Sequence, residues 1–275
     1  YLGLFLLLCT YALVHKGGKN QTGARASHCM ITARAIVAFG LCLFLCFSGP
    51  AFSASSISWD MEAFEPDMKN IPSLQNGFKL YTNYCLGCHS LKYQRYERTA
   101  DDLLIPHDLL EEHLIFTNQK KGDLMTTAMD PVKAKAWFGA PPPDLTMVAR
   151  ARDSEWVYNY LKTFYVDESR PFGVNNKVFE NVGMPNVLME LQGVQRLNCA
   201  PDVEDCRELV VEAGSGILGQ DEFDNAIYDL TNFLHYVGDP SQEQRRSLGV
   251  WVLAFLAFLG IFTYLLNREY WKDVH

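Results

Sequence analysis

Near the C-terminal end of the chain, residues 247–267 contain no charged side chain, and residues 248–266 are almost wholly apolar. As an α-helix with a rise of about 1.5 Å per residue, this stretch spans roughly 30 Å, the thickness of the hydrocarbon core of a bilayer. The sequence therefore predicts a transmembrane anchor at residues 247–267 and a short tail at residues 268–275. Aromatic residues that suit the membrane interfaces lie near both ends of the anchor: Trp251, Tyr264, Tyr270 and Trp271.

A second apolar stretch, residues 35–47, follows Met30 and one early charge, and it precedes a small-residue site that ends at Ser53. This order is typical of a secretory signal peptide, and the stretch is shorter than a helix that crosses a bilayer. We therefore predict a signal peptide at residues 30–53, cleaved after Ser53. Residues 1–29 are interpreted as an upstream extension, with Met30 as the true first residue.

Residues 54–246 lie between these two elements and are predicted to form one exported domain. Apolar residues at helical spacing predict helices at residues 77–91, 154–164 and 221–237, and the connections between them are long and rich in Pro and Gly. Alternation typical of strands is scarce. The expected fold class is mainly α, a helical domain with long loops plus one C-terminal transmembrane helix.

The net charge of the chain is −8. Residues 1–53 contain four basic residues and no acidic one, so the remaining chain carries 20 basic against 32 acidic residues, a balance of −12. This acidity argues against nucleic acid as a partner. It is compatible with a basic protein partner attracted over a distance, and equally with simple solubility.

The sequence Cys85-Leu86-Gly87-Cys88-His89 is the attachment motif of a c-type haem. Two thiols three residues apart can each form a thioether with a vinyl group, and His89 supplies an imidazole to the iron. A redox dithiol, a structural disulfide or half of a zinc site are the alternatives. A dithiol favours a βαβ context and zinc requires further ligands at close spacing, and neither is evident. The motif therefore predicts one covalently attached haem c.

A haem that transfers electrons usually has a second axial ligand, commonly a Met sulfur that raises its reduction potential. Met184 lies in the irregular segment Asn181-Val182-Gly183-Met184-Pro185, whose Gly and Pro favour a loop. We therefore predict His89 and Met184 as the axial ligands of the iron. The alternatives for ligation by a second imidazole, which are more often surface or core residues, are His107, His113 and His235.

Three segments resemble the cytochrome c1 family and occur in that family's order. Residues 85–96, CLGCHSLKYQRY, resemble its haem-binding segment, and residues 139–152, GAPPPDLTMVARAR, are similar to its Pro-Pro-Asp-Leu segment. Residues 182–188 resemble its axial-methionine loop. With the C-terminal anchor, the resemblance covers residues 57–275.

The resemblance implies a cytochrome c-like helical haem domain of bacterial type. It implies that Pro142 and Pro143 pack on the porphyrin and that Arg152, with Arg150, lies near a haem propionate. A run of prolines is stiff and forms a flat apolar wall, and an arginine beside a carboxylate makes a charge-assisted hydrogen bond. Without the resemblance, residues 141–143 would more simply be an ordinary rigid loop.

The function implied is that of the haem c subunit of ubiquinol–cytochrome c reductase, the cytochrome bc1 complex. The chain would be no enzyme on its own: it would accept electrons from the Rieske iron-sulfur protein, beside cytochrome b, and reduce a soluble or membrane-bound cytochrome c. Its place would be the bacterial inner membrane, with the haem domain in the periplasm and the tail in the cytoplasm. Candidate docking residues are acidic: Asp101, Asp102, Glu111, Glu112 and residues 202–212.

Two other functions share the haem motif. A free-standing anchored cytochrome c would not require the Pro-Pro-Asp-Leu segment, and a haem-based gas sensor or peroxidase would require an open sixth position on the iron. Residues 196–216 depart from the family pattern and resemble an insertion. Within it Cys199 and Cys206 could close a disulfide in an oxidising compartment, which their spacing permits but does not require.

Overall fold

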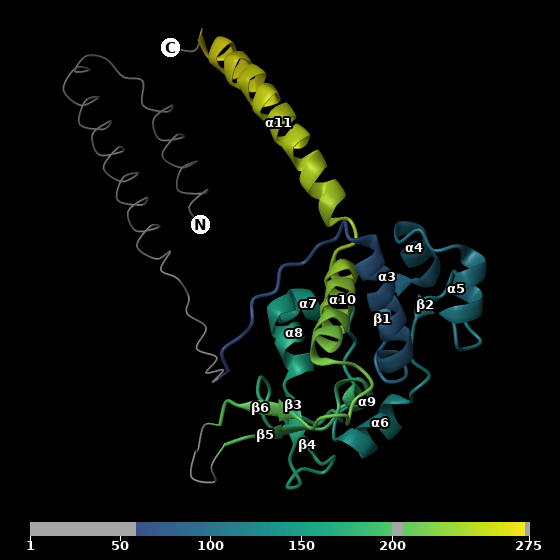
Figure 1. The fold of residues 1–275 in the computed structure, drawn as a ribbon. Helices are drawn as coiled ribbons and strands as arrows, with labels where there is room; N and C mark the ends of the chain where they lie inside the picture. Colours follow the sequence, from purple (N-terminus) through teal and green to yellow (C-terminus); the bar gives the residue numbers. More distant parts are fainter. Residues whose placement is uncertain (1–58, 200–205, 273–275) are drawn as a thin grey trace, which may run out of the picture. The chain divides into compact units, whose positions relative to one another are not determined.

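The computed structural model describes residues 59–199 and 206–272 (Figure 1). All of them belong to one unit by their contacts. The predicted upstream extension and signal peptide lie outside the described residues.

Helix α3, Ile71–Leu80, begins six residues before the helix predicted at residues 77–91. The Asn70 side chain accepts a hydrogen bond from Ser73 N, and Pro72 occupies the first turn, a common start for a helix. The helix continues as the π-helical turn η1, Tyr81–Cys85. After η1 the backbone N–H groups of Cys88 and His89 donate hydrogen bonds to the Cys85 carbonyl. The prediction was therefore wrong at both ends.

Helix α10, Gln220–Gly238, extends the predicted 221–237 helix by one residue at each end and packs against α3 (Figure 1). The rings of Phe78 and Phe233 stack across this contact with centroids 5.2 Å apart. The backbones come so close at Gly77 that a Cβ placed there would lie 2.1 Å from the carbonyl oxygen of Asp229. The helix pair is the centre of a core that includes Leu74, Phe78, Ile227, Leu230 and Phe233.

Helix α8, Ser154–Lys162, begins where predicted and ends two residues early, because Phe164 starts a strand. The described residues contain three sheets of two antiparallel strands each, β1–β2, β3–β4 and β5–β6. These strands are two to five residues long, too short for an alternating pattern to be visible in the sequence. Their bounds are β1 Leu91–Arg95, β2 Leu124–Met125, β3 Phe164–Val166, β4 Val174–Asn176, β5 Gln195–Leu197 and β6 Leu209–Val211.

Short helices complete the domain, so the prediction of a mainly helical fold with long loops is confirmed. Several of these helices end within two turns. The loops between the helices contain residues 143–146 and the segment around Met184. Their bounds are α4 Tyr96–Asp102, α5 His107–His113, α6 Pro131–Phe138, α7 Val148–Ala151 and α9 Met189–Gln192.

Helix α11, Gln242–Tyr270, contains the predicted anchor and extends it by polar turns on both sides. Among the described residues it is the one helix long and apolar enough to cross a membrane, with a mean hydropathy of 2.2 over its apolar window. None of its residues is buried within the chain. Its length and apolar surface fit a single membrane span, so the predicted C-terminal transmembrane helix is confirmed in these respects.

We predict that Gly77→Ala destabilises the domain by about 1–3 kcal/mol, because the added methyl group overlaps the backbone of α10. Thermal unfolding of the detergent-solubilised protein, followed by circular dichroism, measures the effect. Gly122→Ala is the control, since a Cβ at that glycine meets no atom within 4 Å. Equal unfolding midpoints for the two variants would contradict the close approach of α3 and α10.

Candidate functional site

The two cysteines of the attachment motif lie at the end of η1 and three residues after it, and neither forms a disulfide. Cys85 is buried and Cys88 is half-buried. Burial raises the pKa of the Cys85 thiol to about 12 and also raises the pKa of Cys88. Within the described ranges, no group of three His, Cys, Asp or Glu residues is placed to hold a metal ion, so the zinc alternative gains no further ligands there.

The imidazole of His89 is buried and held in one orientation. Its Nδ1 lies 2.7 Å from the carbonyl oxygen of Pro143, which can only accept, so Nδ1 carries the proton. Nε2 is then the unprotonated nitrogen, the form that ligates a metal. Burial lowers the pKa of His89, against the raising effects of the Pro143 carbonyl and of Asp144, which favours this neutral form. The donor set therefore fits a haem iron bound through Nε2.

Residues 143–146 run as a strap beside the residues that follow the motif. Leu145 N donates to the Ser90 carbonyl at 2.9 Å, and the Asp144 carboxylate accepts from Lys92 N at 2.8 Å. The same carboxylate accepts from Thr146 N at 3.0 Å. The structure thus brings together two segments that the sequence singled out separately, and it leaves Pro142 half-buried and Pro143 exposed beside His89.

The two arginines predicted near a propionate have different surroundings. Arg150 lies 3.7 Å from the Asp239 carboxylate and packs on Gly238, at the end of α10. Arg152 is exposed, and its guanidinium lies 5.3 Å from the ring centroid of Trp156. Arg152 is therefore the freer of the two to meet an added carboxylate.

Met184 is half-buried in the loop after β4 and packs against a small cluster of Phe164, Val174 and Val182. The Tyr160 hydroxyl donates a hydrogen bond to its Sδ over 3.4 Å. The described contacts do not join Met184 to His89: each is held by its own neighbours. Sequence reasoning missed Tyr160: its spacing of four from Trp156 places the two rings on one helix face but does not indicate the contact with Met184.

Asparagine side chains order the backbone that leads to Met184. Asn175 Oδ1 accepts from Asn181 N at 2.9 Å, and the fully buried Asn176 accepts from Val178 N and Phe179 N. Asn181 itself has a positive φ of 60°, which asparagine tolerates better than most residues. The loop is therefore irregular but fixed.

The three alternative histidines have partners of their own or lie at the surface. His107 Nε2 lies 2.8 Å from the Asp101 carboxylate, and His235 Nδ1 lies 2.7 Å from Ser154 Oγ. His113 is exposed beside Glu112. None of them lies in the strap or in the Met184 loop.

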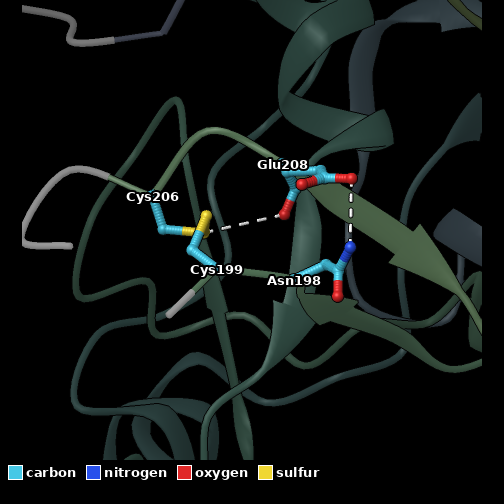
Figure 2. The surroundings of a disulfide bond; sticks show 4 residues. All are labelled: Asn198, Cys199, Cys206 and Glu208. Atoms are coloured by element: carbon cyan, nitrogen blue, oxygen red, sulfur yellow. Dashed lines mark hydrogen bonds between the residues drawn. A yellow bond between two sulfur atoms is a disulfide. The ribbon is translucent and has the colours of Figure 1, made fainter. Parts of the chain in front are cut away.

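Cys199 and Cys206 are joined by a disulfide with their Cα atoms 5.7 Å apart, as Figure 2 shows. The bond closes the end of the β5–β6 hairpin, within the segment that departs from the family pattern. Asn198 Nδ2 donates to the Glu208 carboxylate at 3.0 Å beside it. The disulfide therefore ties the two strand ends together.

Comparison with known proteins gives a consistent result. A model described as the Cytochrome C1 family matches residues 64–274. A protein named cytochrome c1 from Allochromatium vinosum is 47% identical over 239 residues, which cover 86% of this chain and 98% of that protein. Cytochrome c1 from Rhodobacter capsulatus is 24% identical over 265 residues, covering 82% of this chain and 92% of that protein.

A further relative carries another name. A protein named ammonia monooxygenase gamma subunit from Nitrosomonas europaea is 43% identical over 210 residues, covering 76% of this chain and 86% of that protein.

We predict that Asp144→Ala loosens the strap and lowers the free energy of unfolding by about 1–3 kcal/mol, because two backbone N–H groups lose their acceptor. Thermal unfolding of the purified protein measures this. Glu168→Ala, which removes an exposed carboxylate from a turn, serves as the control and should change the midpoint little. An Asp144→Ala midpoint equal to that of the control would contradict the strap.

Proposed function

The chain belongs to the cytochrome c1 family, the electron-transferring haem subunits of the cytochrome bc1 complex, and on this premise we propose that it carries one covalently bound haem c. We also propose its electron donor and acceptor: the chain takes single electrons from the Rieske iron-sulfur protein and reduces a cytochrome c. The observation that carries the proposal is the hydrogen bond from His89 Nδ1 to the Pro143 carbonyl, which leaves Nε2 as a ligand.

In this proposal, Cys85 and Cys88 form the two thioethers and His89 is the proximal ligand. The haem, when bound, supplies a one-electron carrier whose iron alternates between two oxidation states. The chain contributes orientation and tuning: the Pro143 carbonyl makes the imidazole a fixed and more basic ligand through Nδ1–H. No acid, base or nucleophile is required of the protein.

Met184 is proposed as the second axial ligand, on a loop whose backbone is fixed by Asn175 and Asn176. Pro142 and Pro143 are proposed to line the porphyrin, since the Pro143 carbonyl meets His89 Nδ1 and Pro142 directly precedes it. Arg152, which is exposed and has no carboxylate partner among the described ion pairs, is proposed to meet a propionate together with Arg150, which also pairs with Asp239.

The proposed setting is a bacterial inner membrane, spanned once by α11. A signal peptide at residues 30–53 would export residues 54–246 to the periplasm and leave residues 268–275 in the cytoplasm. The side chains of α11, none of which is buried within the chain, would then meet lipid and the helices of cytochrome b.

Docking of the acceptor is proposed to rely on the acidic surface, because a transient electron carrier must bind weakly and quickly. Asp101, beside His107 on α4, and Glu112 on α5 are exposed, whereas Asp102 is half-buried and engaged by Arg98 and Tyr236. We therefore assign the steering role to the exposed carboxylates rather than to Asp102.

The test is purification in mild detergent, followed by reduced-minus-oxidised spectra and quinol-dependent reduction of a soluble cytochrome c. We expect b-type haem and an iron-sulfur subunit to accompany the chain. Met184→Leu should abolish the low-spin His/Met signature and the turnover, because leucine offers no lone pair to the iron. Met189→Leu, which changes a neighbouring methionine of the same small cluster, is the control and should keep both.

Two results would contradict the proposal. If the chain purifies without other subunits, with an intact c-type spectrum but no quinol-linked activity, the result would favour a free-standing anchored cytochrome. Recovery with the subunits of an ammonia monooxygenase, the assembly in the name of the Nitrosomonas relative, would place the chain in a different electron path.

A further inference from the structure

Tyr160 is the described side chain whose polar atom meets the sulfur of Met184. We propose that the Tyr160 hydroxyl, through its hydrogen bond to Met184 Sδ, is a positioning group that holds the thioether in place and raises the reduction potential of the site. The inference rests on the proposed function, in which Met184 is an axial ligand. It assigns a role to a residue outside the attachment motif, the proline strap and the methionine loop.

The geometry directs the hydroxyl at the sulfur. The distance from Tyr160 Oη to Met184 Sδ is 3.4 Å, within the range of hydrogen bonds to sulfur. The ring of Tyr160 is stacked on Trp156, with centroids 4.9 Å apart and an angle of 11° between the planes. Phe164 meets the same ring edge-on at 5.1 Å. Both contacts restrict rotation of the phenol.

The backbone at Tyr160 is fixed as well. Its carbonyl accepts a hydrogen bond from Asn176 Nδ2 at 2.7 Å, and Asn176 is the fully buried residue that orders the loop before Met184. One asparagine therefore ties the helix that carries the donor to the loop that carries the acceptor. The hydroxyl and the sulfur are held in register by the fold rather than by their own contact alone.

The chemistry follows from the two lone pairs of a thioether. If one lone pair of Met184 is given to iron, the other remains free to accept the Tyr160 proton. The hydrogen bond withdraws electron density from the sulfur and makes it a weaker donor, which disfavours the oxidised state more than the reduced one. Hydrogen bonding around the ligands is an established means by which proteins tune such centres. The Tyr160 hydroxyl thus favours the reduced form of the iron and holds the Met184 sulfur in its position.

A column of side chains links this contact to the other end of the proposed site. Arg152, Trp156 and Tyr160 follow one another at intervals of four residues, and the guanidinium of Arg152 lies over the Trp156 ring. The residue proposed to meet a propionate and the residue that holds the methionine therefore share one aromatic neighbour. A change at Trp156 should disturb both.

The experiment is a redox titration of the detergent-purified protein carrying Tyr160→Phe, monitored in the haem absorption bands. The substitution keeps the ring and its stacking on Trp156 and removes only the hydroxyl. We expect the midpoint potential to fall, so that the ratio of reduced to oxidised protein at a fixed ambient potential drops by roughly two- to tenfold, the range that one neutral hydrogen bond supports. The spectrum of His/Met ligation should persist.

The matched control is Tyr158→Phe, on the same helix. The Tyr158 hydroxyl accepts from Lys162 Nζ at 3.3 Å, on a contact away from Met184, so this variant should leave the potential unchanged. A potential equal to wild type in both variants would overturn the role of Tyr160. Equal losses in both variants would also overturn it, since they would indicate a general effect on the helix.

Comparison with Met184→Leu separates failure of this inference from failure of the proposed function. Loss of the His/Met signature in Met184→Leu, together with an unchanged potential in Tyr160→Phe, rejects only the hydrogen bond. An intact signature in Met184→Leu rejects Met184 as a ligand, and the role of Tyr160 fails with it. Loss in Met184→Leu with a lowered potential in Tyr160→Phe supports both.

Discussion

The hydrogen bond between His89 and the Pro143 carbonyl joins two segments 54 residues apart and fixes the chemistry of the site. A proline carbonyl in a stiff strap has little freedom to move, so the imidazole ring adopts one orientation and one tautomer. The strap in turn depends on Asp144, whose carboxylate satisfies backbone N–H groups on both sides. The orientation of His89 is therefore set by a backbone carbonyl, which a motif of side chains does not reveal.

The regular part of the molecule serves as the frame for these loops. Helices α3 and α10 approach at Gly77 more closely than any larger residue would permit, and α8 packs beside α10 and carries Tyr160. The attachment motif begins at the last residue of η1, the turn that continues α3, and the methionine loop is fixed to α8 through Asn176. Irregular segments can thus hold a precise arrangement because each is tied to a rigid helix, mostly by side-chain to backbone hydrogen bonds.

The sequence predicted those features whose signals are local. The α10 pattern of apolar residues placed both ends within one residue, and the uncharged apolar run located the anchor because a bilayer sets its length. The start of α3 lies six residues before the predicted one, where Asn70 caps the helix and Pro72 occupies its first turn. The resemblance to the cytochrome c1 family was confirmed by the comparisons. The contacts of His89 with Pro143, and of Tyr160 with Met184, arise from tertiary folding and had no counterpart in spacing along the chain.

The measurement that tests the account most directly is mass spectrometry of the tryptic peptide that contains the attachment motif. Trypsin should release residues 80–92, after Lys79 and Lys92, and this peptide contains Cys85, Cys88 and His89. We predict that the peptide carries one haem joined to both cysteines, with neither thiol open to alkylation. Recovery of the same peptide with two free or alkylated thiols, from protein purified out of its native membrane, would contradict it.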